Sequence, residues 1–196
     1  MPVWTWRFHL GGGGRWNQAG RRRGALRGVA SVVAMAWCCG ASAAAGQGAR
    51  IGHRAPGFGL PTLSGDSLSL PGLRGHPVLL AFWATWCPSC RAEMPELARV
   101  GAAHAGVGLM VVTIDADQTR ERVLEYAGAF PTGTVSGLTW LLDHRSRVAR
   151  QYHIPVLPSA VFVDSDGVVR AIHHGAMSAA ELADGIRAIL PTNQQE

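Results

Sequence analysis

The chain has 196 residues, of which 47% are hydrophobic, so it can bury one ordinary core and does not have the composition of a disordered protein. Its net charge of +5 comes from 18 basic residues, all of them arginines, and 13 acidic residues. Six arginines precede Gly46, whereas every acidic residue follows it, which leaves 12 arginines against 13 acids in the rest of the chain. The basic character belongs to the N-terminal segment, so the rest of the chain does not favour a nucleic acid as partner.

Residues 1–46 have the pattern of a targeting segment. Three arginines at 21–23 precede a stretch without charge from Gly28 to Ala49, and small residues at 41–45 fit a signal-peptide cleavage site. Alternatively, Gly28–Gly46 stays as an N-terminal membrane anchor, or the start codon is misassigned before a shorter signal. A signal and an anchor both place residues 47–196 in the periplasm or on the extracytoplasmic face of the cytoplasmic membrane.

After this segment, the chain alternates between strand and helix patterns. Short apolar runs rich in β-branched and aromatic residues predict buried strands at residues 78–84, 108–115, 138–143, 159–164 and 168–174. Apolar residues at helical spacing predict helices around Cys90, Met94, Leu97 and Val100, around Val123, Tyr126 and Ala127, and around Leu182, Ile186, Ile189 and Leu190. The turn Ser165-Asp166-Gly167 joins the last two strands as a hairpin. This order predicts an α/β fold, a three-layer sandwich around a mixed sheet.

Two cysteines, Cys87 and Cys90, follow the first long strand and open the first long helix. The unpaired N–H groups and the positive dipole end of a helix stabilise an anion there. We therefore expect a stabilised thiolate with an exposed sulfur at Cys87, and Cys90 one turn further on the inner face. Unequal thiols of this kind suit a nucleophile and a resolving thiol in disulfide exchange.

The two cysteines have other interpretations. Zinc needs four ligands, but the other two cysteines lie in the N-terminal segment and the histidines show no paired ligand spacing beyond His173-His174. A structural disulfide is compatible with an exported domain, although so small a loop constrains the unfolded chain little. No flavin, nucleotide or metal motif is present, so we predict no metal and no cofactor.

The stretch FWATWCPSCRAEMPEL, residues 82–97, together with Leu157-Pro158-Ser159 before AVFVDSDG, resembles the thioredoxin-like superfamily. Within it, the chain is most similar to the TlpA/ResA group of exported thiol-disulfide oxidoreductases, over roughly Ile51 to Leu190. The resemblance implies a thioredoxin-like three-layer sandwich with a central mixed β-sheet flanked by helices. It also implies a short N-terminal hairpin before the first core strand and an extra strand-helix insert between Ile114 and Tyr152.

The resemblance also implies roles for individual residues. Cys87 and Cys90 would be the catalytic pair, and Trp86 would pack beside the sulfurs, with a place in the core as the alternative. Pro158 would be cis and face the cysteines. Glu93, three residues after Cys90 and on the same helical face, matches a glutamate that ResA-like proteins keep beside the disulfide; the alternative is a solvated helix carboxylate.

The implied activity is thiol-disulfide exchange, in which Cys87 attacks a partner's disulfide and Cys90 resolves the mixed disulfide. The common task of the group is to reduce exported proteins such as apocytochrome c or copper-site proteins, with electrons from a membrane thiol-electron donor. Pro88-Ser89 replaces the Gly-Pro or Glu-Pro dipeptide common among reductants, so the direction of electron flow stays open.

Rival functions come from other classes. A DsbA-like thiol oxidant or isomerase would also use a Cys-Pro-x-Cys pair, but usually with His where Ser89 stands. A Sco-type copper-binding chaperone, which is not an enzyme, would need a wider cysteine spacing and a distant ligand histidine. A peroxidase would need a peroxidatic cysteine in a different loop, and residues 47–196 contain no further cysteine.

Overall fold

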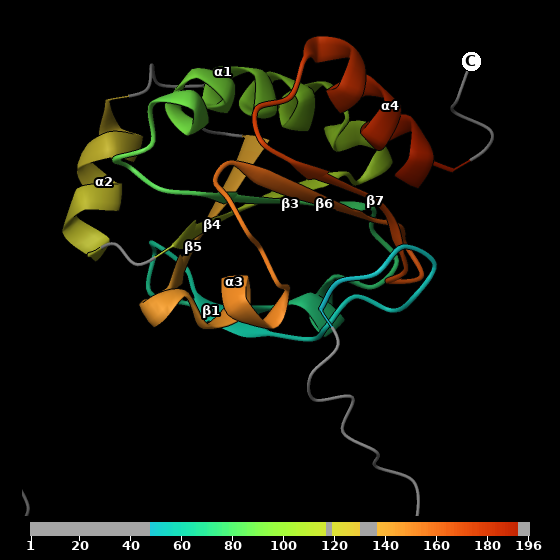
Figure 1. Cartoon of the computed structure of the whole chain (residues 1–196), viewed down its shortest axis with the longest axis horizontal. Coiled ribbons are helices and arrows are strands. Elements are labelled where there is room, and N and C mark those ends of the chain that lie inside the picture. Colours follow the sequence, from blue (N-terminus) through green and yellow to red (C-terminus); the bar gives the residue numbers. More distant parts are fainter. Residues whose placement is uncertain (1–47, 117–118, 130–136, 192–196) are drawn as a thin grey trace, which may run out of the picture. The chain divides into compact units, whose positions relative to one another are not determined.

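Five strands form one mixed sheet with the order β5-β4-β3-β6-β7 (Figure 1). The strands are β3 (Val78–Trp83), β4 (Met110–Ala116), β5 (Leu138–Asp143), β6 (Ser159–Val163) and β7 (Val169–His174). β3, β4 and β5 run parallel, whereas β6 and β7 pair antiparallel. All residues of β3 and β6 are buried, as expected for central strands that are covered on both faces.

Helices and a hairpin cover the two faces of the sheet. One face carries α1 (Pro88–Ala103) and α4 (Ala179–Ile189), with α2 (Arg120–Gly128) beside α1, and the other carries α3 (Arg147–Gln151) and the hairpin of β1 (Gly59–Pro61) and β2 (Ser67–Ser69) (Figure 1). Short 3-10 turns lie at η1 (Leu70–Leu73), η2 (Ala105–Val107) and η4 (His144–Ser146). A separate hydrophobic cluster fills each side of the sheet. The predicted three-layer sandwich, its mixed sheet and its N-terminal hairpin are confirmed.

The computed structural model describes residues 48–116, 119–129 and 137–191. The targeting segment at 1–46, with both of its alternatives, lies outside the described residues. Within the described ranges, no helix is long and apolar enough to cross a membrane. The boundary at residue 47 therefore stays a prediction.

The insert predicted between Ile114 and Tyr152 consists of α2, β5 and α3. β5 forms one edge of the sheet and is tied to the N-terminal hairpin by an antiparallel bridge between Thr62 and Leu141. At the end of β5, the buried Asp143 carboxylate accepts hydrogen bonds from the backbone N–H groups of Val148 and Ala149, at 2.9–3.0 Å. Because the first N–H groups of a helix have no partner inside it, Asp143 satisfies the start of α3.

Two glycines allow the covering helices to approach the sheet closely. A Cβ on Gly101 of α1 would lie 2.2 Å from the carbonyl oxygen of Gly137, just before β5. A Cβ on Gly185 of α4 would lie 2.3 Å from the ring of Phe162 in β6. Neither distance is compatible with a larger residue, so the absence of a side chain at these positions sets how closely α1 and α4 pack.

Candidate active site

The cysteines lie where β3 leads into α1. Cys87 is the N-cap of α1 and Pro88 is its first residue, which suits proline because that position needs no N–H partner. Cys87 and Cys90 form a disulfide with an S–S distance of 2.08 Å. The Cys87 sulfur also accepts a hydrogen bond from the backbone N–H of Cys90 at 3.2 Å. The predicted placement of Cys87 at the positive end of the helix is confirmed.

The expected exposure of the Cys87 sulfur is wrong for this disulfide form. Cys87 is 4% exposed and Cys90 is 1% exposed. As the N-cap, the Cys87 side chain turns back over the first helical turn, where it meets both the Cys90 N–H and the Cys90 sulfur. Cys90 lies on the inner face of α1, as predicted, within the hydrophobic cluster between α1 and the sheet.

Trp86, directly before the nucleophile candidate, is 63% exposed. The alternative that placed it in the core is therefore wrong. Its side chain lines a groove together with Val156, which is 48% exposed. The other lining residues come from β4, η4, α3 and the loop that follows α3: Ala116, Ser146, Ala149, Arg150, Ile154, Pro155 and Leu157. A groove lined mainly by apolar side chains thus includes the residue that directly precedes Cys87.

Pro158 follows the one cis peptide bond of the described residues, as predicted. The register places Pro158 at the same end of the strands as the cysteines, because Ser159 pairs with Phe82 near the end of β3. Pro158 is buried, and its carbonyl oxygen accepts a hydrogen bond from the N–H of Gly175 at 2.9 Å. The loop before β6 is thereby attached to the end of β7.

Glu93 lies on α1 one turn after Cys90 and is half-buried. Its carboxylate accepts a hydrogen bond from the backbone N–H of Met177, in the loop between β7 and α4. Burial raises the pKa of the Glu93 carboxyl, while the Met177 hydrogen bond and the nearby His173 act to lower it. Glu93 is therefore not the fully solvated carboxylate of the alternative interpretation.

An aromatic cluster from β3, α2 and β5 was not predicted from the sequence. The rings of Trp83, Tyr126 and Trp140 have centroids 5.0–6.2 Å apart. The Tyr126 hydroxyl donates to the carbonyl oxygen of Arg91 at 3.4 Å. This carbonyl is the one that Pro95, four residues later and without an N–H, cannot bond. Pro95 and a distant tyrosine were readable separately, but only the fold brings them together.

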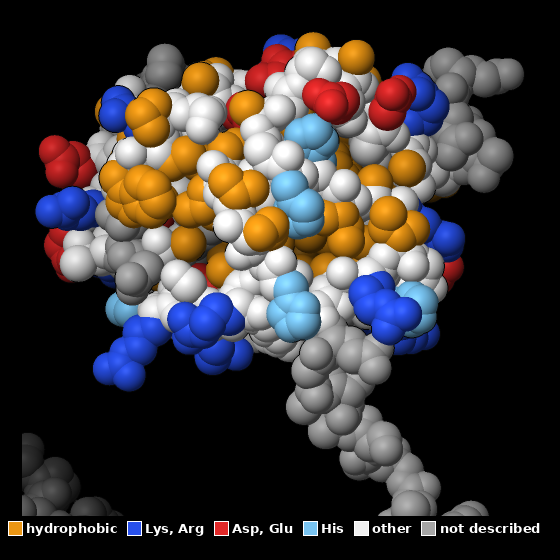
Figure 2. Space-filling view, in the orientation of Figure 1, with side chains coloured by type: hydrophobic (Ala, Val, Ile, Leu, Met, Phe, Trp, Pro, Cys, Tyr) orange, Lys and Arg blue, Asp and Glu red, His pale blue; other side chains and the backbone are white. Residues whose placement is uncertain are grey.

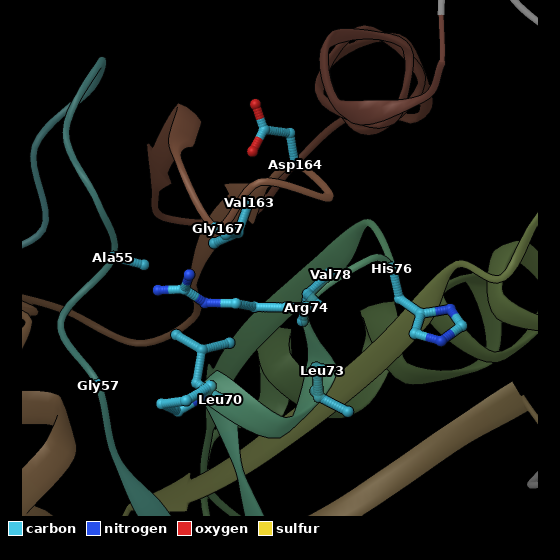
Figure 3. Close-up of a pocket in the computed structure, with 11 residues that line it drawn as sticks. Ala55, Gly57, Leu70, Leu73, Arg74, His76, Val78, Val163, Asp164 and Gly167 are labelled. Atoms are coloured by element: carbon cyan, nitrogen blue, oxygen red, sulfur yellow. The ribbon is translucent and has the colours of Figure 1, made fainter.

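Two other kinds of candidate site were a metal site and a small pocket away from the sulfurs. No group of three or more His, Cys, Asp or Glu suited to a metal occurs among the described residues. A small pocket at the start of β3, at the opposite end of that strand from the cysteines, is lined by Leu70, Val78 and Val163, with Arg74 reaching across it (Figure 3). It does not border the disulfide.

Comparisons with known proteins agree with this geometry. The AhpC/TSA family matches residues 51–172. The chain is 34% identical over 139 residues to the thioredoxin-like protein YneN of Bacillus subtilis, covering 69% of this chain and 78% of the relative. It is 29% identical over 143 residues to the thiol-disulfide oxidoreductase ResA of Geobacillus kaustophilus, covering 72% and 79%.

A solved structure of similar fold is that of a secreted Mycobacterium tuberculosis disulfide oxidoreductase homologous to E. coli DsbE. Its TM-score is 0.58 at 30% identity, covering 67% of this chain and 95% of that one. The predicted thioredoxin-like fold and the resemblance to the ResA-type oxidoreductases are confirmed.

Proposed function

Because the chain belongs to the AhpC/TSA family and is a thiol-disulfide oxidoreductase, we propose that Cys87 and Cys90 are its catalytic pair. The observation that carries this proposal is the disulfide at the start of α1, with the Cys90 N–H directed at the Cys87 sulfur. A sulfur at a helix N-terminus is held more favourably as a thiolate, by about 0.3–1 kcal/mol for the dipole alone. Cys87 is therefore the nucleophile and Cys90 the resolving thiol.

The exchange proceeds in two steps. The Cys87 thiolate attacks one sulfur of a partner's disulfide, that S–S bond breaks, and the other partner sulfur leaves as a thiolate that takes up a proton. Cys90, after losing its proton, attacks the Cys87 sulfur of the mixed disulfide and releases the second partner thiol. Two electrons pass to the partner, and the Cys87–Cys90 disulfide that remains needs a dithiol donor to be reduced again.

The groove beside Trp86 is suited to a protein partner. Trp86 and Val156 expose large apolar surfaces in this groove, and Arg150 is the only charged residue among those that line it. Figure 2 shows hydrophobic side chains gathered over the middle of one face of the molecule, with Arg and acidic side chains toward its rim. In this proposal Trp86 and the loop at cis-Pro158 bind the partner chain, and Glu93 adjusts the proton balance of the pair.

The direction of exchange is reductive in this proposal. The substrates are disulfides of exported proteins, such as apocytochrome c or copper-site proteins, and a membrane thiol-electron donor restores the dithiol. The ResA relatives are named thiol-disulfide oxidoreductases and the M. tuberculosis relative is described as secreted, which supports disulfide exchange with exported proteins. The domain at 47–196 then works in the periplasm or on the extracytoplasmic face of the membrane, after a signal peptide or N-terminal anchor at 1–46.

Trapping of the mixed disulfide tests the proposed roles. Cys90→Ser should accumulate covalent partner adducts on Cys87, because the resolving sulfur is gone, whereas Cys87→Ser should accumulate far fewer. Acid quenching of cells, followed by mass spectrometry of each variant, measures the adducts, and the variant without either cysteine is the matched control. Equal trapping, or adducts mainly on Cys90, would contradict the assignment.

A redox titration tests the direction. A reductant should have a potential near the value of about −270 mV for thioredoxin, and a DsbA-like oxidant near about −120 mV. Partners trapped on Cys87 that carry reduced cysteines in their mature form would agree with the first value. A potential near the second value, with trapped partners that keep structural disulfides, would favour the oxidant.

A further inference from the structure

Ser159, the first residue of β6, lies directly after the cis bond and is 2% exposed. Its hydroxyl oxygen is 2.7 Å from the carbonyl oxygen of Val156 and 3.0 Å from Nδ1 of His174. His174 ends β7 and is paired in register with Ser159. A buried hydroxyl therefore connects an edge-strand histidine to the loop that precedes the cis-proline.

The proton on each atom follows from what these groups can do. A carbonyl oxygen only accepts, and a serine hydroxyl has one hydrogen to donate. Ser159 must therefore donate to the Val156 carbonyl, which leaves its oxygen as the acceptor toward His174. Nδ1 of His174 carries the hydrogen and donates it, so the structure assigns the Nδ1–H tautomer when the ring is neutral.

This chain of hydrogen bonds acts on the groove beside the cysteine pair. Val156 lines that groove with Trp86. The carbonyl oxygen of Val156 accepts the hydrogen bond from the Ser159 hydroxyl. The nearby bond from the Gly175 N–H to the Pro158 carbonyl, at 2.9 Å, joins the same two segments. One bond from the residue after β7 and one from Ser159, at the start of β6, thus hold the loop on both sides of Leu157.

We propose that His174 is a positioning residue for protein substrates: through Ser159, its Nδ1–H holds the segment Val156–Pro158 in place along the groove. This role rests on the proposed function, since it requires that the groove receives the partner chain. His174 itself is exposed, so burial does not order its ring and the bond to Ser159 does. Loss of the bond should weaken the binding of a protein partner and leave the exchange chemistry of the sulfurs unchanged.

The first test is the tautomer of His174, measured from the ring ¹⁵N chemical shifts of the neutral histidine by NMR. We expect Nδ1–H in the wild-type protein and loss of this preference in Ser159→Ala. This measurement does not depend on any activity. A wild-type His174 with its hydrogen on Nε2 would overturn the proposal.

The second test compares a protein substrate with a small one. With dithiothreitol as the dithiol donor, His174→Leu should raise the KM for reduction of insulin about two- to tenfold, which corresponds to the net free energy of one hydrogen bond. Its rate with hydroxyethyl disulfide should be unchanged, because that molecule is too small to span the loop. His174→Asn should restore the KM in part, since the Asn amide can supply an N–H near the position of Nδ1.

His53→Leu is the matched control, because His53 is exposed and its carbonyl bonds to Val169 at the opposite end of β7. An unchanged KM in His174→Leu, or equal losses with both substrates, would overturn the positioning role alone. A wild-type protein that reduces neither substrate would contradict the proposed function, while the tautomer would still report on the hydrogen bonds.

Discussion

Glu93 is a half-buried titratable side chain on α1, one turn after Cys90. Burial raises its pKa, the Met177 hydrogen bond and His173 oppose this, and the net direction is upward from 4.5. The folded protein therefore binds this proton more tightly than the unfolded chain does. The stability contributed by this effect is present below pH 4.5 and is lost as the pH rises through the raised pKa.

Glu93→Gln should remove this pH-dependent loss, because glutamine does not ionise. As the pH rises above 4.5, we expect the difference in free energy of unfolding between the variant and the wild type to shift in favour of the variant. The same variant should change the pH dependence of Cys87 alkylation by iodoacetamide. Urea unfolding and alkylation rates across a pH series measure the two effects.

Glu125→Gln, at an exposed position of α2, is the control and should alter neither series. Alkylation curves that superpose for Glu93→Gln and the wild type would assign Glu93 a structural role only, through its bond to Met177.

At the scale of elements, α3 depends on one side chain from the preceding strand. α3 has five residues, and its N-cap, Ser146, makes no capping hydrogen bond with its side chain. The Asp143 carboxylate supplies the acceptor for two N–H groups instead. Since Ala149 and Arg150 line the groove beside Trp86, the position of this short helix also shapes the groove.

Asp143→Leu should lower the free energy of unfolding by about 1–3 kcal/mol for each buried N–H group left without its acceptor. Asp143→Asn keeps one acceptor oxygen and should lose less. Urea denaturation of the two variants and the wild type measures the difference. A Leu variant as stable as the wild type would show that the carboxylate does not hold α3.

At the scale of the whole molecule, the proposed functional residues gather at one end of the strands of the sheet. β3 delivers the cysteines there, β6 begins there after the cis bond, and β7 ends there beside Ser159. These strands lie within residues 78–174, after the targeting pattern at 1–46. We therefore expect the catalytic unit to be independent of the leader.

A protein consisting of residues 47–196 should melt within a few degrees of the full chain and keep its insulin reductase activity. The full chain, fractionated from its host, should place this domain outside the cytoplasm. Circular dichroism, the activity assay and protease accessibility of intact spheroplasts provide the measurements. Recovery of the full-length protein in the cytosolic fraction would contradict export.

Local patterns in the sequence determined much of the fold. Periods of two and 3.6 residues located the strands and helices, the Asp-Gly turn predicted the β6–β7 hairpin, and the resemblance implied the cis bond at Pro158. The start of α1 at Cys87 was also predicted from the sequence, because the helical pattern begins there, directly after a buried strand. The first N–H groups of such a helix have no partner inside it. Apart from the cis bond, which only the family resemblance implied because X-Pro bonds are usually trans, these features depend on residues that are close in the chain.

The tertiary structure alone decided which distant groups meet. Glu93 bonds to Met177 and Tyr126 to the Arg91 carbonyl, in each case across a separation that no helical or strand period spans. The tertiary structure also decided which residues are buried. Trp86 is exposed and Cys87 is buried, although they are neighbours in the chain. Sequence patterns report the hydrogen bonds and the buried face within one element. The order and register of the strands determine which elements meet at one end of the sheet, and the candidate site lies at that end.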